Sequence, residues 1–217
     1  MQKYKAVIFD LDGTLINSID DLADSANAVL RQYGFPTHDT ESYKYRVGNG
    51  IRKLMQRALP QDKQDLLDAA LAKFKQIYAE HNMDKTAPYD GIKELLQTLK
   101  QRRIPVAICT NKHDEAAKDI VKQLFAQDTF DQIIGDKPGL ARKPDPGKVL
   151  AIAKNWQLAP SEIAYLGDSG VDMQTAVNAG MLPVGVLWGF RKEDELLADG
   201  AKVLLQNPAE LLHKVSF

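Results

Sequence analysis

Residues 6–15, AVIFDLDGTL, join a short apolar run to two carboxylates, a glycine and a threonine. The run is brief, apolar and closed by a turn signal, so it predicts a buried β-strand. Because side chains alternate along a strand, Asp10 and Asp12 are expected to project to the same side of its C-terminal tip. Ligands of open α/β sheets bind beyond the carboxyl ends of the strands. Two acids there indicate a nucleophile with a proton donor, a cation site or both; an Asx turn is the purely structural alternative.

The composition is that of an ordinary folded protein, with 44% hydrophobic and 26% charged residues in a chain of 217. A formal net charge of -1 provides no basic field for nucleic acid or an anionic membrane. No apolar stretch reaches the length of a membrane span. The single cysteine, Cys109, cannot form an internal disulfide, and the N-terminus leads directly into a strand without a signal-peptide core. We therefore expect a cytoplasmic protein; its oligomeric state is not readable from the sequence.

The chain then divides into a helical part and an alternating part. Residues 16–85 contain only helical patterns: one begins after Asn17 or Ser18, one follows Gly50, and one is opened by Asp62. From residue 86 onward, helices alternate with apolar strands, expected at residues 104–109, 132–134, 163–166, 183–187 and 202–205.

This alternation predicts the α/β class, with a doubly wound, Rossmann-like parallel sheet covered by helices on both faces. The expected catalytic core comprises residues 1–15 and 86–217, and residues 16–85 form an inserted all-α cap. The strand order does not follow from the pattern.

Polar residues follow three of the later elements. Thr110 and Asn111 end the second core strand, where a hydroxyl and amide donors suit a phosphoryl oxygen, or else cap the next helix. Lys143 precedes a proline-stiffened helix start and offers a point charge for a phosphate, unless it is a solvated surface lysine. Asp168 and Asp172 lie at a strand tip and one helical turn later, close enough for one cation; a helix N-cap is the alternative.

Together these clusters resemble the four motifs of the haloacid dehalogenase-like superfamily, and the resemblance covers nearly the full chain. A helical cap between the first and second motifs is that superfamily's type-one cap. The resemblance implies that Asp10 is the nucleophile of an aspartyl-phosphate pathway, and that Asp12 protonates the leaving alkoxide and then deprotonates water. It implies phosphoryl stabilisation by Thr110, Lys143 and backbone amides near Gly13 and Asn111.

A nucleophilic carboxylate near a phosphate calls for a divalent cation, and Mg²⁺ fits because it prefers oxygen ligands. The ligands implied by the resemblance are Asp10, the backbone carbonyl of Asp12, Asp168 and, through water, Asp172. Dehalogenases of the superfamily lack the second acid, because a halide leaves without a proton. Asp12 therefore favours hydrolysis of a phosphate ester.

The cap is expected to set the substrate. Residues 44–52 place Asn49 between Gly48 and Gly50 at an expected helix start, with Arg46 and Arg52 nearby. Such a segment suits an anion, although a helix–helix turn with solvated basic residues is the alternative. Together with residues 12–15 (DGTL) and residues 180–191, this segment resembles bacterial phosphoglycolate phosphatases, whose substrate carries a carboxylate far from its phosphate.

The expected function is thus hydrolysis of a small phosphorylated metabolite, 2-phosphoglycolate. Arg46, Gly48, Asn49 and Gly50 are the expected cap contacts, with Gly13 and Asn111 in the core. A pyrophosphatase, a sugar phosphatase and a phosphoglucomutase of the same superfamily are alternatives. A phosphorylatable switch or binding protein is a further alternative from a different class.

Three other residue types are assigned to structure. Cys109 and Trp156 are expected to pack in the core. The histidines are too far apart in sequence for ligand spacing, so no zinc is expected. Trp188 ends a strand at the catalytic edge, where it either packs or lines the entrance.

Overall fold

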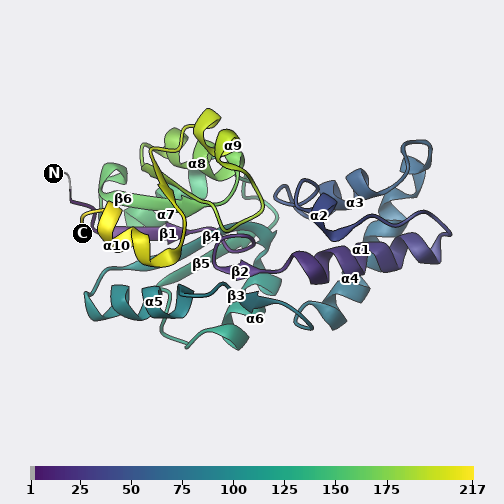
Figure 1. Ribbon diagram of the computed structural model, residues 1–217, viewed down its shortest axis with the longest axis horizontal. Coiled ribbons are helices and arrows are strands. Elements are labelled where there is room, and N and C mark those ends of the chain that lie inside the picture. The colour runs from purple at the N-terminus through teal and green to yellow at the C-terminus, as the bar shows by residue number, and fades with distance from the viewer. Residues whose placement is uncertain (1–2) are drawn as a thin grey trace. The chain divides into compact units, whose positions relative to one another are not determined.

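The structure, a computed structural model, describes residues 3–217, which form two compact units (Figure 1). One unit comprises residues 17–87, and the other comprises the residues up to 16 together with residues 88–217. The chain passes between them at two short strands, β2 (Ile16–Asn17) and β3 (Ala87–Pro88), which pair with each other.

The larger unit contains a six-stranded parallel sheet in the order β5-β4-β1-β6-β7-β8. The first strand along the chain is central, and the later strands are added outward on both sides of it. This is the doubly wound arrangement that the sequence predicts. The strands are β1 (Ala6–Phe9), β4 (Val106–His113), β5 (Gln132–Asp136), β6 (Ile163–Gly167), β7 (Leu182–Val186) and β8 (Val203–Leu205).

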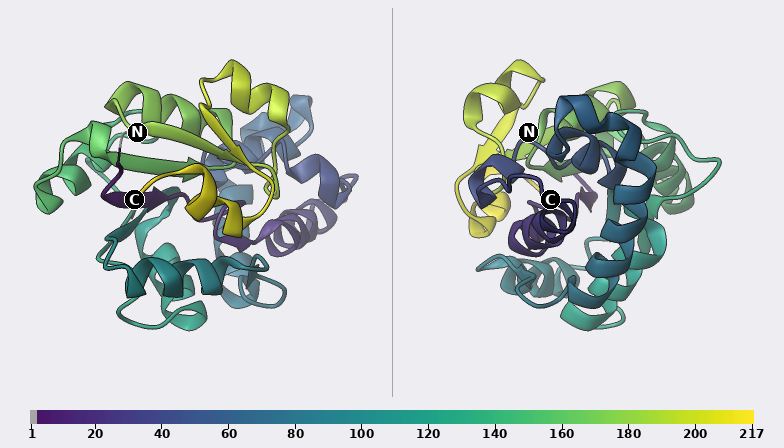
Figure 2. Two further views of the ribbon diagram at one scale, coloured as in Figure 1. Left: turned by 60° about the vertical axis from the view of Figure 1, so that its left-hand side comes forward. Right: turned by 90° about the vertical axis from the view of Figure 1, so that its right-hand side faces the viewer.

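Helices cover both faces of this sheet (Figure 2). On one face, α7 (Gly147–Trp156) and α8 (Gly170–Ala179) pack on a buried cluster that includes Ile8, Cys109 and Tyr165. The opposite face carries α5 (Ile92–Gln101) and α6 (Asp114–Leu124). Two further helices, α9 (Glu193–Ala198) and α10 (Leu211–Lys214), complete the unit. Cys109 and the partly buried Trp156 lie at this core, as predicted.

The second core strand differs from its prediction at both ends. β4 begins at Val106 instead of residue 104, because Pro105 has no N–H with which to join the ladder. It also continues to His113, with a register shift against β5 between Cys109 and His113. Thr110 and Asn111 therefore lie inside a strand, and the alternative that they cap the next helix is wrong. The helix α9 was not predicted; its first turn is acidic, which suits a helix N-terminus.

The smaller unit is helical, with α1 (Ile19–Gln32), α2 (Thr40–Tyr43), α3 (Ile51–Ala58) and α4 (Leu67–His81). Helix α1 packs on α4, burying apolar side chains such as Leu30 and Phe74. Three differences from the sequence analysis appear. α2 was missed, residues 61–66 form a 3₁₀ turn ahead of α4, and β2 provides a short strand where only helix was expected. Among residues 3–217, none of the helices has both the length and the apolar character of a membrane span.

Candidate active site

Three carboxylates meet beyond the carboxyl ends of β1 and β6. Asp10 directly follows β1, Asp168 directly follows β6, and Asp172 lies in the first turn of α8. One oxygen of each lies within 4.8 Å of one oxygen of the others, and all three residues are buried. The parallel sheet causes this convergence, because the ends of β1 and β6 are adjacent.

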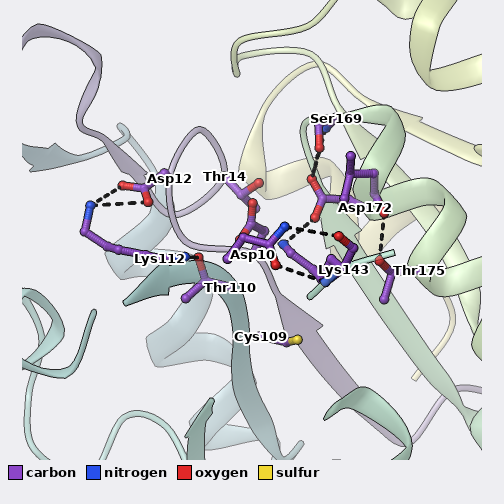
Figure 3. Close-up of polar contacts among 12 residues, drawn as sticks. Asp10, Asp12, Thr14, Cys109, Thr110, Lys112, Lys143, Ser169, Asp172 and Thr175 are labelled. Atoms are coloured by element: carbon purple, nitrogen blue, oxygen red, sulfur yellow. Dashed lines mark hydrogen bonds and ion pairs between the residues drawn. The ribbon is translucent and has the colours of Figure 1, made fainter. Parts of the chain in front are cut away.

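Lys143 is the cation of this cluster, and its side chain is only 2% exposed. The Nζ atom lies 2.8 Å from Asp10 Oδ1 and 2.6 Å from Asp172 Oδ1 (Figure 3). It also donates to the Tyr165 hydroxyl oxygen at 3.1 Å. An ammonium has three protons, so these three partners fix its orientation. The alternative that Lys143 is a solvated surface lysine is wrong.

Burial and like charge shape the protonation of the cluster. Burial, followed by the nearby Asp172 carboxylate, raises the pKa of Asp10 to about 7, although Lys143 opposes the shift. The pKa of Asp168 is raised well above its ordinary value, first by burial and then by Asp172 and Asp10. Burial alone would lower the pKa of Lys143, but Asp10 and Asp172 raise it, so the ammonium stays charged. With all three acids ionised, the single ammonium would leave an excess of negative charge, and this excess is part of the reason that Asp10 and Asp168 hold their protons more tightly.

Asp172 also serves the local helix. Its Oδ2 accepts hydrogen bonds from Ser169 N at 3.1 Å and Ser169 Oγ at 2.6 Å, while Oδ1 accepts from Lys143 and lies 3.1 Å from the Tyr165 hydroxyl. Asp172 therefore both stabilises the start of α8 and belongs to the acidic cluster. With both oxygens engaged by protein donors, Asp172 suits contact with a cation through water better than direct ligation.

The loop after β7 positions Asp168. Phe190 N donates to Asp168 Oδ2 at 2.8 Å, and Thr14 Oγ1 lies 3.4 Å from Oδ1. Gly13 has φ +86°, and a Cβ there would lie 2.3 Å from Asp168 Oδ2, so only glycine lets the two loops meet. Trp188 Nε1 donates to Thr14 O at 3.0 Å. Trp188 is partly buried, and this bond ties it to the loop that follows β1; both alternatives for Trp188 remain predictions.

The polar residues of β4 support the neighbouring segments. Asn111 Oδ1 accepts from Lys143 N at 3.0 Å, and Asn111 Nδ2 donates to Lys143 O at 3.3 Å, so this side chain clamps the lysine backbone. Thr110 O accepts from the buried Lys148 Nζ at 3.0 Å. Thr110 Oγ1 accepts from Lys112 N at 3.1 Å.

Asp12 is turned away from the other acids. The strand ends at Phe9, so the alternation that predicted a shared side for Asp10 and Asp12 stops before either residue. Lys112 Nζ donates to Asp12 Oδ1 at 2.9 Å and Oδ2 at 3.3 Å. Figure 3 shows the Asp12 carboxylate pointing toward Lys112 and away from the group formed by Asp10, Lys143 and Asp172.

The acidic cluster fits a divalent cation. Apart from its ion pair with Lys143, Asp10 Oδ1 is a buried oxygen that makes no hydrogen bond to any residue in 3–217. Buried negative charge needs compensation, and carboxylate oxygens are the ligands of hard cations. A divalent ion beside Asp10 and Asp168 would supply the two positive charges that Lys143 alone does not.

The expected cap residues lie together at the start of α3, where Gly50 precedes the helix with φ +81°. The Arg46 guanidinium is already engaged: Nη1 donates to Ser42 O at 2.8 Å, Nη2 lies 3.3 Å from His38 Nδ1, and the group lies over the Tyr43 ring. Arg52 pairs with Asp68 at 2.5 Å. These contacts give both arginines partners inside the helical unit.

Asn49 is held by an arginine that the sequence analysis did not single out. Arg57 Nη2 donates to Asn49 Oδ1 at 2.8 Å, and Arg57 Nη1 donates to Arg46 O at 3.0 Å. Because a guanidinium only donates, the amide atom that faces it is the oxygen. The Asn49 amide nitrogen is therefore directed away from Arg57.

Two core residues also escaped the sequence analysis. Tyr165 is fully buried, with its hydroxyl oxygen 3.2 Å from Cys109 O as well as near Lys143 and Asp172. The sequence signal for Tyr165 was its hydroxyl group, a polar group in an otherwise apolar strand two residues before Gly167. For Lys112, the signal was a cation directly after Thr110 and Asn111.

Comparison with known proteins identifies the family. The profile of the haloacid dehalogenase-like hydrolases matches residues 7–186. A phosphoglycolate phosphatase of Chromobacterium violaceum is 35% identical over 216 residues, 97% of this chain and 96% of its own length. Another, from Neisseria meningitidis, is 35% identical over 93% of this chain and 88% of its own.

Solved structures agree in fold. A proposed phosphoglycolate phosphatase from Lactobacillus delbrueckii subsp. bulgaricus is similar with a TM-score of 0.93 and 31% identity, covering 99% of both chains. A haloacid dehalogenase-like family hydrolase from Streptococcus pneumoniae has a TM-score of 0.88 and 25% identity over 97% of this chain and 98% of its own. The chain belongs to the haloacid dehalogenase-like hydrolase family.

Proposed function

We propose that this protein is a Mg²⁺-dependent phosphatase that hydrolyses 2-phosphoglycolate through an aspartyl-phosphate on Asp10. The observation that carries the proposal is the buried Asp10 carboxylate, aimed by Lys143 and adjacent to Asp168 and Asp172. The similarity to phosphoglycolate phosphatases along the whole chain supports the substrate.

In the first half of the reaction, an Asp10 oxygen attacks phosphorus while the bond to the ester oxygen breaks. Asp12 gives its proton to the departing alkoxide, and Thr110, Lys143 and the backbone amides near Gly13 and Asn111 bind the phosphoryl oxygens. In the second half, Asp12 takes a proton from water as that water attacks the phosphorus of the acyl phosphate. Phosphate leaves, and the Asp10 carboxylate is restored.

The ion would be held by the side chains of Asp10 and Asp168 and by the backbone carbonyl of Asp12, with Asp172 acting through water. When bound, Mg²⁺ supplies positive charge that offsets the repulsion between the nucleophile and the substrate phosphate. Lys143 contributes to the same end, because it aims Asp10 and adds a fixed positive charge.

We assign residues 16–85 as the cap and residues 46–50 as its substrate-recognition segment. Since the Arg46 guanidinium already binds Ser42 O and His38, its role is to support this segment. Gly48, Asn49 and Gly50 then offer amide donors for an anionic substrate. A reducing compartment such as the cytoplasm suits the buried Cys109 thiol, whose pKa burial raises to about 11.

The test is phosphate release from a panel of esters with Mg²⁺ and then with EDTA. The panel contains phosphoglycolate, pyrophosphate, sugar phosphates and nucleotides. We expect activity that requires Mg²⁺ and a kcat/KM highest for phosphoglycolate. Preference for pyrophosphate or a sugar phosphate would replace the substrate but keep the mechanism, whereas no turnover of any ester would refute the proposal.

A further inference from the structure

Lys112 and Asp12 form an ion pair in which the cation is the more deeply buried partner. The side chain of Lys112 is 5% exposed and that of Asp12 is 20% exposed. Both carboxylate oxygens of Asp12 lie within 3.3 Å of the same Nζ. The backbone of Lys112 is held in place, because it lies in β4 and its N–H donates to Thr110 Oγ1.

This ion pair conflicts with the role proposed for Asp12. A general acid must come within hydrogen-bond reach of the oxygen that it protonates. Asp12 instead points toward Lys112 and away from the nucleophile Asp10 (Figure 3). Turning it toward the reacting centre would leave a buried ammonium without its carboxylate, which is strongly unfavourable unless another anion replaces it.

We propose that Lys112 is a specificity-determining residue that retains Asp12 until a second anionic group of the substrate takes the place of the Asp12 carboxylate. An ester with a carboxylate near its leaving oxygen releases Asp12 as it binds, and a neutral ester does not. When the second anionic group of the substrate binds Lys112, Asp12 is free to move to the leaving oxygen as the acid. Lys112 therefore discriminates between charged and neutral esters through kcat. The inference rests on the proposed phosphatase function and deepens its substrate choice.

The test compares phosphoglycolate with ethyl phosphate, which lacks the carboxylate, in the wild-type enzyme and in Lys112→Gln. With the retaining charge removed, kcat for ethyl phosphate is expected to rise at least about tenfold. For phosphoglycolate, KM is expected to rise about tenfold while kcat changes less than about threefold. Lys112→Arg is the matched control and should keep the wild-type pattern.

A merely structural lysine would give a different result. A fall in kcat by one common factor for both esters, or an unchanged kcat for ethyl phosphate, would overturn the inference. The proposed function fails separately, if the wild-type enzyme does not prefer phosphoglycolate. The response of ethyl phosphate hydrolysis to Lys112→Gln still decides the role of Lys112 in that case.

A measurement on the wild-type enzyme covers the possibility that Lys112→Gln does not fold. Acetate supplies a carboxylate that is not attached to the ester, so at constant ionic strength it should raise kcat for ethyl phosphate at least about threefold. Acetamide, its neutral counterpart, should have no effect. Equal rates with acetate and with acetamide would overturn the inference.

Discussion

Replacement of Tyr165 by phenylalanine would remove one oxygen from the centre of the buried cluster. That oxygen accepts from Lys143 Nζ at 3.1 Å and lies within donating distance of Asp172 Oδ1 at 3.1 Å and Cys109 O at 3.2 Å. A phenol has one proton, so it donates to only one of these two acceptors. The burial that raises the Tyr165 pKa well above its ordinary value keeps that proton in place.

The variant therefore loses two hydrogen bonds, at least one of them to a charged group. Hydrogen bonds to charged groups contribute about 1.5–3 kcal/mol each, so we expect the free energy of unfolding to fall by about 2–4 kcal/mol. Lys143 keeps Asp10 and Asp172 but loses its third partner. A loosened ammonium aims the nucleophile less well, and a loss of about 1.4 kcal/mol in the transition state would lower kcat about tenfold.

The assays are denaturant unfolding and steady-state kinetics on the substrate that the panel identifies. Because Tyr165 is not expected to touch the substrate, KM should change less than about twofold. Tyr43→Phe is the matched control: Tyr43 is equally buried, and its hydroxyl donates to Asn27 Oδ1 at 2.8 Å within the helical unit. It should lose about 1 kcal/mol of stability with kcat within about twofold of wild type. A Tyr165→Phe enzyme that loses stability but keeps its kcat would refute the positioning argument.

Three further predictions concern the same cluster. Asp10→Asn should lower turnover at least about a thousandfold. It should not lower the melting temperature of the metal-free protein, because burial disfavours the charged carboxylate that the amide replaces. Substantial residual activity would exclude Asp10 as the nucleophile. Trp188→Phe removes the hydrogen bond to Thr14 O, so half-maximal activity should require about three to ten times more Mg²⁺, as measured by titration. The folded-state pKa of Asp10, about 7, exceeds its ordinary value of 3.8, so the stability that its protonation provides is lost as pH rises through 7. The melting temperature of the metal-free protein should therefore fall between about pH 4 and 7 and level off above pH 7, and saturating Mg²⁺ should reduce that slope. A flat metal-free profile between about pH 4 and 7 would contradict the argument.

The doubly wound class of the core was predictable because it depends on short-range patterns, whereas the strand order was not. Apolar strands alternating with amphipathic helices define a parallel sheet, and the carboxyl ends of adjacent strands must lie at one edge. The pattern places Asp10 and Asp168 at the same edge of the sheet. Their meeting there was implied only by the family resemblance, because the pattern does not show that β1 and β6 are neighbours. The length of β4 was not predictable, since its continuation through Thr110 and Asn111 depends on a register shift against β5.

Side-chain partners at the site depend on contacts between distant segments, which a single sequence does not reveal. Asn111 was expected near the phosphate, and the structure shows that its side chain clamps the backbone of Lys143, 32 positions later. Tyr165 was passed over because an aromatic residue in a strand is ordinary, and only the packed structure reveals its polar partners. Arg46 and Arg52 were expected near the substrate from their charge, and only the structure shows that Arg46 contacts Ser42 and His38 and that Arg52 pairs with Asp68.

The difference between Asp10 and Asp12 follows from their lysines. Asp10 is buried and shares Lys143 with Asp172, so its carboxylate is fixed where attack on phosphorus requires it. Asp12 has its own lysine, and that pair is directed away from the centre. A nucleophile benefits from being fixed in advance, whereas an acid that must first donate and then accept a proton has to move relative to its substrate. Two carboxylates of one short motif can therefore take different roles because Lys143 fixes the first and Lys112 retains the second outside the reacting centre.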